Sequence, residues 1–258
     1  MMISDKHAHI LQNEPAYQQY LRWLNDPCFD AATQAELRGI ANRPEAIADR
    51  FGSSLSFGTG GLRGLIGAGT NRMNTYTVAQ ATEGLARYLL EQDAGARGQC
   101  VVISYDSRLF SSYFAEIAAG VLCRRGIPVR LAGVLHPVPV LSYAIRHFQA
   151  AAGIMITASH NPAAYNGYKV YGSDGGQITL AAARAIQTAI RTADDLRSIG
   201  WMSVVQACEA GLLTFWDKDV DRAYFDYLLA GRVKPEQAGL LAGLKIVVDA
   251  GNGAGGFY

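Results

Sequence analysis

The sequence predicts an α/β fold, built on a mostly parallel mixed sheet with helices on both faces. Three short apolar runs, at 99–106, 127–134 and 151–157, have the length and composition of buried strands, and helical patterns separate them. Alternation of strand and helix is typical of a parallel sheet that is covered on both sides. At 258 residues, the chain is long enough for one large α/β domain, or for one domain and part of another.

The first third of the chain combines helices with a glycine-rich stretch. Apolar residues fall at helical spacing from Pro15 to about Phe51. Seven glycines follow from Gly52 to Gly69. Because glycine is unfavourable inside both helices and strands, we expect this stretch to form a loop with at most short strands. A further helix is predicted from Thr75 to Glu91, before the first apolar strand.

The remaining elements continue the alternation towards the C-terminus. Helical spacing of apolar side chains predicts four more helices, at 110–126, 138–148, 180–192 and 217–229. The run from Leu244 to Asp249 has the composition of a new strand that leads into a glycine-rich turn. We therefore expect an N-terminal domain at 1–232, followed at 233–258 by a linker and the truncated start of a second α/β domain.

Composition and charge argue against several classes of protein. The 23 basic and 22 acidic side chains leave a formal net charge of +1, without the basic excess or clustered basic face of a nucleic-acid-binding protein. No run of about 18 apolar residues is present, so no membrane span is predicted, and the N-terminus lacks the apolar core of a signal peptide. The four cysteines lie far apart, which suits a reducing compartment. The expected location is cytoplasmic.

The most informative loop follows the strand at 151–157. In open α/β sheets, ligands bind beyond the carboxyl ends of the strands, and this strand runs directly into Ser159, His160, Asn161 and Pro162. Pro162 lacks a backbone donor and disfavours helix at Asn161, so the segment should remain an exposed loop. Ser159 then presents a hydroxyl, and His160 offers a proton acceptor or a phosphate contact near neutral pH. The same residue types are common in plain turns, and local composition alone favours that interpretation.

Four motifs, in this order along the chain, resemble the α-D-phosphohexomutase superfamily of phosphoglucomutases and phosphomannomutases. FGTGGLRG at 57–64 resembles its N-terminal active-site loop, and SYDSR at 104–108 resembles its aspartate–arginine turn. TASHNP at 157–162 resembles its phosphoserine loop, and NGYKVYGSDGGQI at 166–178 continues the likeness. GAGTNRMN at 67–74 is similar to the branch that holds bacterial phosphoglucomutases and animal phosphopentomutase-like enzymes.

This resemblance, which extends over most of 21–229, implies the domain I fold of a phosphohexomutase. It also implies an intramolecular phosphotransferase that interconverts sugar 1-phosphates and 6-phosphates. Ser159 would carry the phosphoryl group, and Lys169 matches the family lysine proposed as a general acid or base. Arg63 and His160 match residues near the phosphate, and the flanking glycines Gly61 and Gly64 let Arg63 approach an anion closely. The implied partners are a phosphosugar substrate and a hexose bisphosphate activator.

The resemblance carries three further expectations. The four site residues should converge at one edge of the sheet, and Asp106 and Arg108 should brace the loop by an ion pair rather than contact substrate. Mg²⁺ is implied as cofactor, bound through a phosphate on Ser159 and through an aspartate loop, DGD-x-DR, that this sequence lacks. Because that loop, the sugar-recognition loop and the distal phosphate-binding domain are missing, this portion alone is expected to be inactive.

Two other interpretations remain open. A non-catalytic remnant of such an enzyme, which binds phosphate or a partner, would carry the same motifs. A dinucleotide-binding enzyme is the weaker alternative. Gly251, Gly253 and Gly256 match G-x-G-x-x-G after a predicted strand, but the sequence ends before the helix and acidic residue that the motif requires. The identity of the sugar does not follow from any of these motifs.

Overall fold

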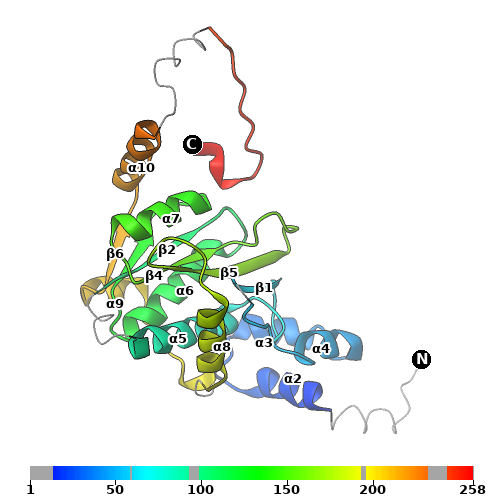
Figure 1. Cartoon of the computed structure of the whole chain (residues 1–258). Helices are drawn as coiled ribbons and strands as arrows, with labels where there is room; N and C mark the ends of the chain where they lie inside the picture. The colour runs from blue at the N-terminus through cyan, green and yellow to red at the C-terminus, as the bar shows by residue number, and fades with distance from the viewer. Residues whose placement is uncertain (1–13, 59, 93–98, 193–195, 232–242, 258) are drawn as a thin grey trace.

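A six-stranded sheet forms the centre of the computed structural model (Figure 1), with the strands in the order β1-β5-β4-β2-β3-β6. The described residues are 14–58, 60–92, 99–192, 196–231 and 243–257. The strands are β1 (Gly61–Leu65), β2 (Val101–Tyr105), β3 (Val129–Ala132), β4 (Ala152–Ile156), β5 (Tyr165–Gly172) and β6 (Leu213–Trp216). The three apolar runs that predicted strands are therefore β2, β3 and β4.

The pairing of the strands makes the sheet mixed and mostly parallel, as predicted. β4, β2, β3 and β6 are parallel to their neighbours in that order. β5 runs antiparallel to β4, and β1 runs antiparallel to β5. Because β2, β3 and β4 point the same way, the loops that follow their C-terminal ends meet at one end of the sheet.

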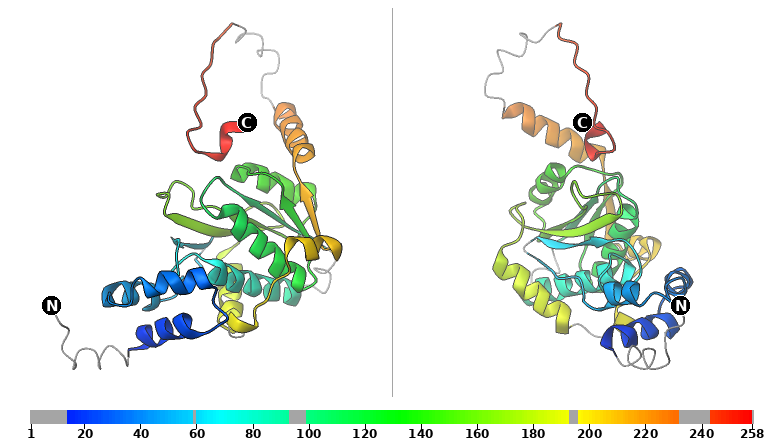
Figure 2. Two further views of the ribbon diagram at one scale, coloured as in Figure 1. Left: turned by 180° about the vertical axis from the view of Figure 1, so that it is seen from behind. Right: turned by 90° about the vertical axis from the view of Figure 1, so that its right-hand side faces the viewer.

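Helices cover both faces of the sheet (Figures 1 and 2). One face carries α5 (Thr75–Gln92), α6 (Ser111–Arg124) and α8 (Leu180–Thr192), and the other carries α7 (Val138–His147) and α10 (Lys218–Ala230). Side chains alternate along each strand, so Ile103 and Ile154 are buried in the first core while Val102 and Met155 are buried in the second. Among the helices that the structure describes, none has both the length and the apolar character to cross a membrane.

The N-terminal helical pattern forms three short helices, α2 (Pro15–Asn25), α3 (Ala31–Arg38) and α4 (Pro44–Phe51). They pack around an aromatic cluster in which the Trp23 ring stacks on Phe29 with their centroids 4.3 Å apart. Trp23 also meets the edge of Tyr76, a residue of α5, at 5.4 Å. This contact attaches the N-terminal helices to the layer that covers the sheet.

Among the described strands and α-helices, the sequence patterns do not predict β5, β6 and α9 (Val204–Glu209). β5 contains two glycines, and the side chains that it buries fall on both faces of the sheet, so its alternation is not visible in the sequence. β6 has only four residues and buries two of them, Leu213 and Trp216. Elements this short give too little periodicity to be recognised.

The strand predicted from Leu244 to Asp249 is wrong. Within the described residues this segment joins no ladder, and it is exposed, with Val247 at 94% of its maximal accessibility. The glycine-rich turn leads into a short 3₁₀ helix, η4 (Ala254–Phe257), rather than an α-helix. The dinucleotide-binding alternative therefore lacks its strand–turn–helix context. The linker expected at 233–242 lies outside the described residues.

Candidate functional site

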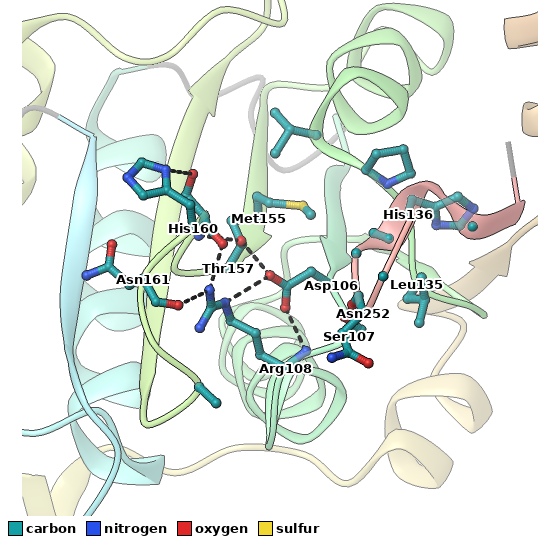
Figure 3. Close-up of a pocket in the computed structure, with 18 of the residues that line it drawn as sticks. Asp106, Ser107, Arg108, Leu135, His136, Met155, Thr157, His160, Asn161 and Asn252 are labelled. Atoms are coloured by element: carbon teal, nitrogen blue, oxygen red, sulfur yellow. Dashed lines mark hydrogen bonds and ion pairs between the residues drawn. The ribbon is translucent and has the colours of Figure 1, made fainter. Parts of the chain in front are cut away.

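The C-terminal ends of β2, β3 and β4 surround a pocket of about 990 Å³ (Figure 3). Its walls come from three strand-end loops, at 106–109, 135–138 and 157–163, and from residues 251–254 and Gly256 of the C-terminal segment. Figure 3 shows His160 and Asn161 on one side of Asp106, and His136 and Asn252 on the other. The pocket lies where sheets of this topology bind their ligands.

Ser159 lies in the exposed turn after β4 and lines this pocket. Its φ angle is 59°, in the left-handed region that residues other than glycine seldom adopt. The Ser159 backbone N–H donates to Thr157 Oγ1 at 2.9 Å. Ser159 Oγ lies 3.3 Å from His160 Nδ1, and the tautomer of the histidine decides which of the two donates. The serine motif therefore places a hydroxyl and an imidazole side by side at the pocket.

Asp106 and Arg108 follow β2 and contact the loop that carries Ser159. The expected ion pair is present, with Arg108 Nε 3.5 Å from Asp106 Oδ2. The two terminal nitrogens of Arg108 also donate to backbone carbonyls of the loop, including that of Ser159 at 2.6 Å. Asp106 accepts hydrogen bonds from Thr157 Oγ1 at 2.6 Å and from Ser111 Oγ at 2.8 Å. Hydrogen bonds, rather than the ion pair alone, join the end of β2 to the serine loop.

Arg63 and Lys169 come from the antiparallel strands β1 and β5. Arg63 Nη1 donates to Asn161 Oδ1 at 3.0 Å, which places its guanidinium beside the serine loop. Lys169 pairs in register with Met155, a residue that lines the pocket. Burial lowers the pKa of Lys169, the positive charge of Arg63 lowers it further, and the carboxylate of Asp106 opposes both effects. Arg63 and Lys169 thus lie close to the residues around the pocket, but neither lines it.

His136 is a pocket residue that sequence reasoning missed. It follows β3, is fully buried, and stacks on Trp216 with ring centroids 4.4 Å apart. His136 Nε2 lies 3.3 Å from Asp221 Oδ1 of α10. Burial lowers the pKa of His136, while the Asp221 carboxylate opposes the shift. The available signal is a His-Pro pair shortly after a predicted strand: His136 comes four residues after β3 ends, and Ser159 comes three residues after β4 ends.

The C-terminal glycine-rich turn is the second contribution that sequence reasoning missed. Residues 251–254 and Gly256 line the pocket, and Ser107 Oγ donates a hydrogen bond to the backbone carbonyl of Asn252. The sequence motif assigned this turn to the start of a second domain and gave no reason to place it beside Ser107. Such a contact depends on how the chain returns to the sheet, which local patterns do not specify.

The described residues do not form a metal site. Mg²⁺ prefers about six oxygen ligands in octahedral geometry. In the described part of the chain, no three His, Cys, Asp or Glu side chains come together as a metal-binding group. Asp106 lines the pocket, but both of its oxygens already accept hydrogen bonds, from Ser111 and Thr157. A phosphate on Ser159 would add oxygen atoms of the kind that Mg²⁺ prefers.

Known proteins share both the sequence and the domain that holds this site. The phosphoglucomutase/phosphomannomutase alpha/beta/alpha domain I model matches residues 54–197. Phosphopentomutase from Mus musculus is 40% identical over 178 residues, which cover 67% of this chain and 28% of that protein. Phosphoglucomutase from Staphylococcus aureus strain bovine RF122 / ET3-1 is 46% identical over 147 residues, covering 57% and 26%. The chain therefore spans about a quarter of the length of these curated relatives.

A solved structure supports the same assignment. It comes from Thermus thermophilus and is provisionally assigned as a phosphomannomutase. It has a TM-score of 0.57 and 32% sequence identity to this chain, with 69% of this chain and 36% of the other covered. The matched region, 54–197, includes β1 to β5, the serine loop and the Asp106–Arg108 turn. This chain belongs to the phosphoglucomutase/phosphomannomutase family.

Proposed function

We propose that this chain forms part of a phosphohexomutase-type enzyme, in which Ser159 carries the phosphoryl group exchanged between positions 1 and 6 of a sugar phosphate. The observation that supports this most directly is the placement of Ser159. It occupies a left-handed turn at the C-terminal end of β4 and lines a pocket of about 990 Å³. In this proposal, residues 1–232 form the phosphoserine domain and 233–258 lead into a second domain.

The residues around Ser159 suit both directions of phosphoryl transfer. When Ser159 accepts a phosphoryl group, its Oγ bonds to phosphorus and the serine proton passes to a base. The bond from phosphorus to the sugar oxygen breaks, and that oxygen leaves as a hydroxyl after it takes a proton from the protonated form of Lys169. His160 Nδ1, 3.3 Å from Oγ, can receive the serine proton. In the return step a sugar hydroxyl attacks the phosphoserine. Lys169 suits the base of that step, because its lowered pKa leaves more of the amine neutral near pH 7 than in free lysine.

Charge neutralisation is the other requirement, because phosphoryl transfer is catalysed mainly by positioning and electrostatics. Arg63 is exposed beside the serine loop, and a guanidinium fork suits phosphate oxygens. We propose a phosphosugar substrate and a hexose bisphosphate activator as the small-molecule partners. We propose that Mg²⁺ binds to the oxygens of a phosphate on Ser159, since among the described residues no three His, Cys, Asp or Glu side chains come together as a metal-binding group. The four free cysteines suit a cytoplasmic location.

A second candidate function is a non-catalytic module that binds phosphate or a phosphosugar. One observation favours it: among the described residues, no three His, Cys, Asp or Glu side chains come together as a group that could hold a metal ion. Such a module would retain Arg63 and the pocket, and it would bind an anion without transferring a phosphoryl group.

The release of sugar monophosphate separates the two functions. After incubation with hexose 1,6-bisphosphate and Mg²⁺, we expect the wild-type chain to release about one equivalent of hexose monophosphate as Ser159 becomes phosphorylated. Ser159→Ala should release none, whereas Ser173→Ala, at an exposed serine outside the pocket, should behave like wild type. Continuous conversion of glucose 1-phosphate to glucose 6-phosphate is not expected from this chain alone. Saturable bisphosphate binding without release would favour the binding module.

A further inference from the structure

Arg108 forms an unusual set of hydrogen bonds with the serine loop. Its Nη2 donates to the carbonyl oxygens of Ser159 and Asn161, both at 2.6 Å. Its Nη1 donates to those of Pro162 and Tyr165, at 3.0 and 3.1 Å. One side chain therefore gathers four carbonyl groups of a single loop. Since carbonyls with aligned dipoles repel one another, the loop needs such a cation at its centre to keep this curvature.

The hydrogen-bonding capacity of Arg108 is fully used by these contacts. A guanidinium has five N–H groups. Four of them point to the loop carbonyls, and the fifth, on Nε, faces Asp106 Oδ2 at 3.5 Å. Arg108 thus retains no donor for a phosphate. Arg63 differs from Arg108 in this respect. Within the described structure its guanidinium donates one hydrogen bond, from Nη1 to Asn161 Oδ1, and its other N–H groups remain for a phosphate.

Asp106 and Thr157 hold the other side of the Ser159 peptide. Thr157 Oγ1 donates to Asp106 Oδ2 at 2.6 Å, so its lone pairs are available to accept the Ser159 N–H at 2.9 Å. Arg108 meanwhile binds the Ser159 carbonyl. The N–H and the C=O of the same residue are therefore fixed by side chains that Asp106 links. A left-handed φ of 59° at a serine persists only where the surroundings over-determine it, and these contacts do so.

We propose that Arg108, Asp106 and Thr157 form a positioning clamp that locks Ser159 in its left-handed conformation and so aims its hydroxyl at the pocket. The effect of the clamp on phosphoryl transfer rests on the function proposed above. Its effect on the backbone conformation of Ser159 does not depend on that function. Arg108 is a positioning residue in this scheme and makes no contact with the transferred phosphate. The clamp sets the orientation of the nucleophile before any substrate binds, which is the contribution expected from preorganisation.

Two variants and one control test the catalytic consequence. Arg108→Lys keeps the charge but replaces the planar fork by a single ammonium, which cannot reach four carbonyls. Thr157→Val keeps the buried shape and removes the hydroxyl that holds the Ser159 amide. Arg38→Lys changes an exposed arginine of α3 whose described partner is Gln34. We expect the rate of Ser159 phosphorylation by hexose 1,6-bisphosphate to fall at least tenfold in the first two variants, about 1.4 kcal/mol of barrier, with the half-saturating bisphosphate concentration unchanged.

A large increase in the half-saturating concentration, with the maximal rate retained, would instead make Arg108 a phosphate ligand and overturn the clamp. The lock itself is measured without substrate, from the ¹³Cα and ¹³Cβ chemical shifts of Ser159. In wild type and in Arg38→Lys they should report the left-handed conformation, and in Arg108→Lys and Thr157→Val they should move towards extended values. If wild type is not phosphorylated but these shifts move, the proposed function fails and the clamp stands. Unchanged shifts in both folded variants contradict the clamp.

Discussion

The serine loop and the C-terminal segment both line the pocket, but the protein holds them in different ways. In the serine loop, Arg108, which follows the neighbouring strand β2, donates hydrogen bonds to carbonyl groups, and Thr157 at the end of β4 accepts one from the Ser159 amide. In the C-terminal segment, a hydrogen bond from Ser107 to the Asn252 carbonyl joins the turn to the sheet. The apolar residues before it remain exposed, with Ile246 at 72% and Val248 at 81%.

This difference shows what fixes a functional loop. Apolar, β-branched residues do not form a strand unless a neighbouring backbone accepts and donates the ladder hydrogen bonds. β4 has β2 on one side and β5 on the other. Hydrogen bonds to both strands therefore fix its C-terminal end, from which the serine loop begins. The segment at 244–249 contains three apolar, β-branched residues, Ile246, Val247 and Val248, but it has no such neighbours in the described structure.

The largest contrast is expected from truncating a buried and an exposed apolar side chain. Ile154 is fully buried in β4, whereas Val247 is 94% exposed. Ile154→Ala should lower the free energy of unfolding by about 2–5 kcal/mol, through lost burial and the cavity left behind. Val247→Ala should change it by no more than about 0.5 kcal/mol. Urea unfolding followed by circular dichroism measures both, and a loss at Val247 comparable to that at Ile154 would show that the segment is packed.

A smaller contrast comes from adding a methyl group to a glycine of β5, which packs beside Thr157 at the start of the serine loop, and to a glycine of the C-terminal segment. A Cβ on Gly167 would lie 2.5 Å from the carbonyl oxygen of Thr157 and 2.9 Å from that of Leu62, on both neighbouring chain segments. A Cβ on Gly255 would meet no atom within 4 Å. We expect Gly167→Ala to cost about 1–3 kcal/mol of unfolding free energy and Gly255→Ala about 0.5 kcal/mol or less. Thermal unfolding provides the measurement, and equal effects would remove the distinction between the regions.

The smallest effect concerns His136, on the pocket wall opposite the serine loop. Asp221 and Asp217 of the α10 region act on it, but burial dominates and lowers its pKa below the ordinary value of about 6.5. Below that pH the unfolded state binds a proton that the folded state resists. The contribution of neutral His136 to the free energy of unfolding should therefore be fully present above about pH 6.5. It should decline as the pH falls from there through the pKa of His136 in the folded state.

Comparison with His136→Gln isolates this contribution, because other groups titrate in both proteins. When the pH is lowered from 7 to 5, the unfolding free energy of wild type should decrease relative to that of the variant. One proton limits the slope to about 1.4 kcal/mol per pH unit. A shift in favour of wild type on acidification would mean that the Asp221 ion pair outweighs burial.

The parts of the fold that the sequence predicts are those whose patterns are long enough to recognise. β2, β3 and β4 are continuous apolar runs, and α8 was predicted with the bounds it has, Leu180–Thr192. β5 was missed because glycines interrupt it, and the strand at 244–249 was wrong because composition does not reveal whether a partner strand is present. Local pattern identifies an element, but pairing decides whether it forms.

The site divides in the same way. Ser159 and His160 could be placed from one strand end, because a buried run followed by a proline-containing turn specifies an exposed loop. The contacts of Arg108 join residues 51 to 57 positions apart, and no local pattern encodes that distance. Residues 251–254 and Gly256 also line the pocket, and the hydrogen bond that joins this turn to the sheet connects residues 145 positions apart.

The most direct test of the central proposal is to locate the phosphate on the chain. The full chain is incubated with hexose 1,6-bisphosphate, digested and analysed by tandem mass spectrometry, with Ser159→Ala treated in parallel. We expect a single phosphorylated residue, Ser159, in the peptide that spans the serine loop, and no phosphate on that peptide in the variant. Phosphate on a different residue while Ser159 stays unmodified would contradict the assignment of Ser159 as the phosphoryl carrier.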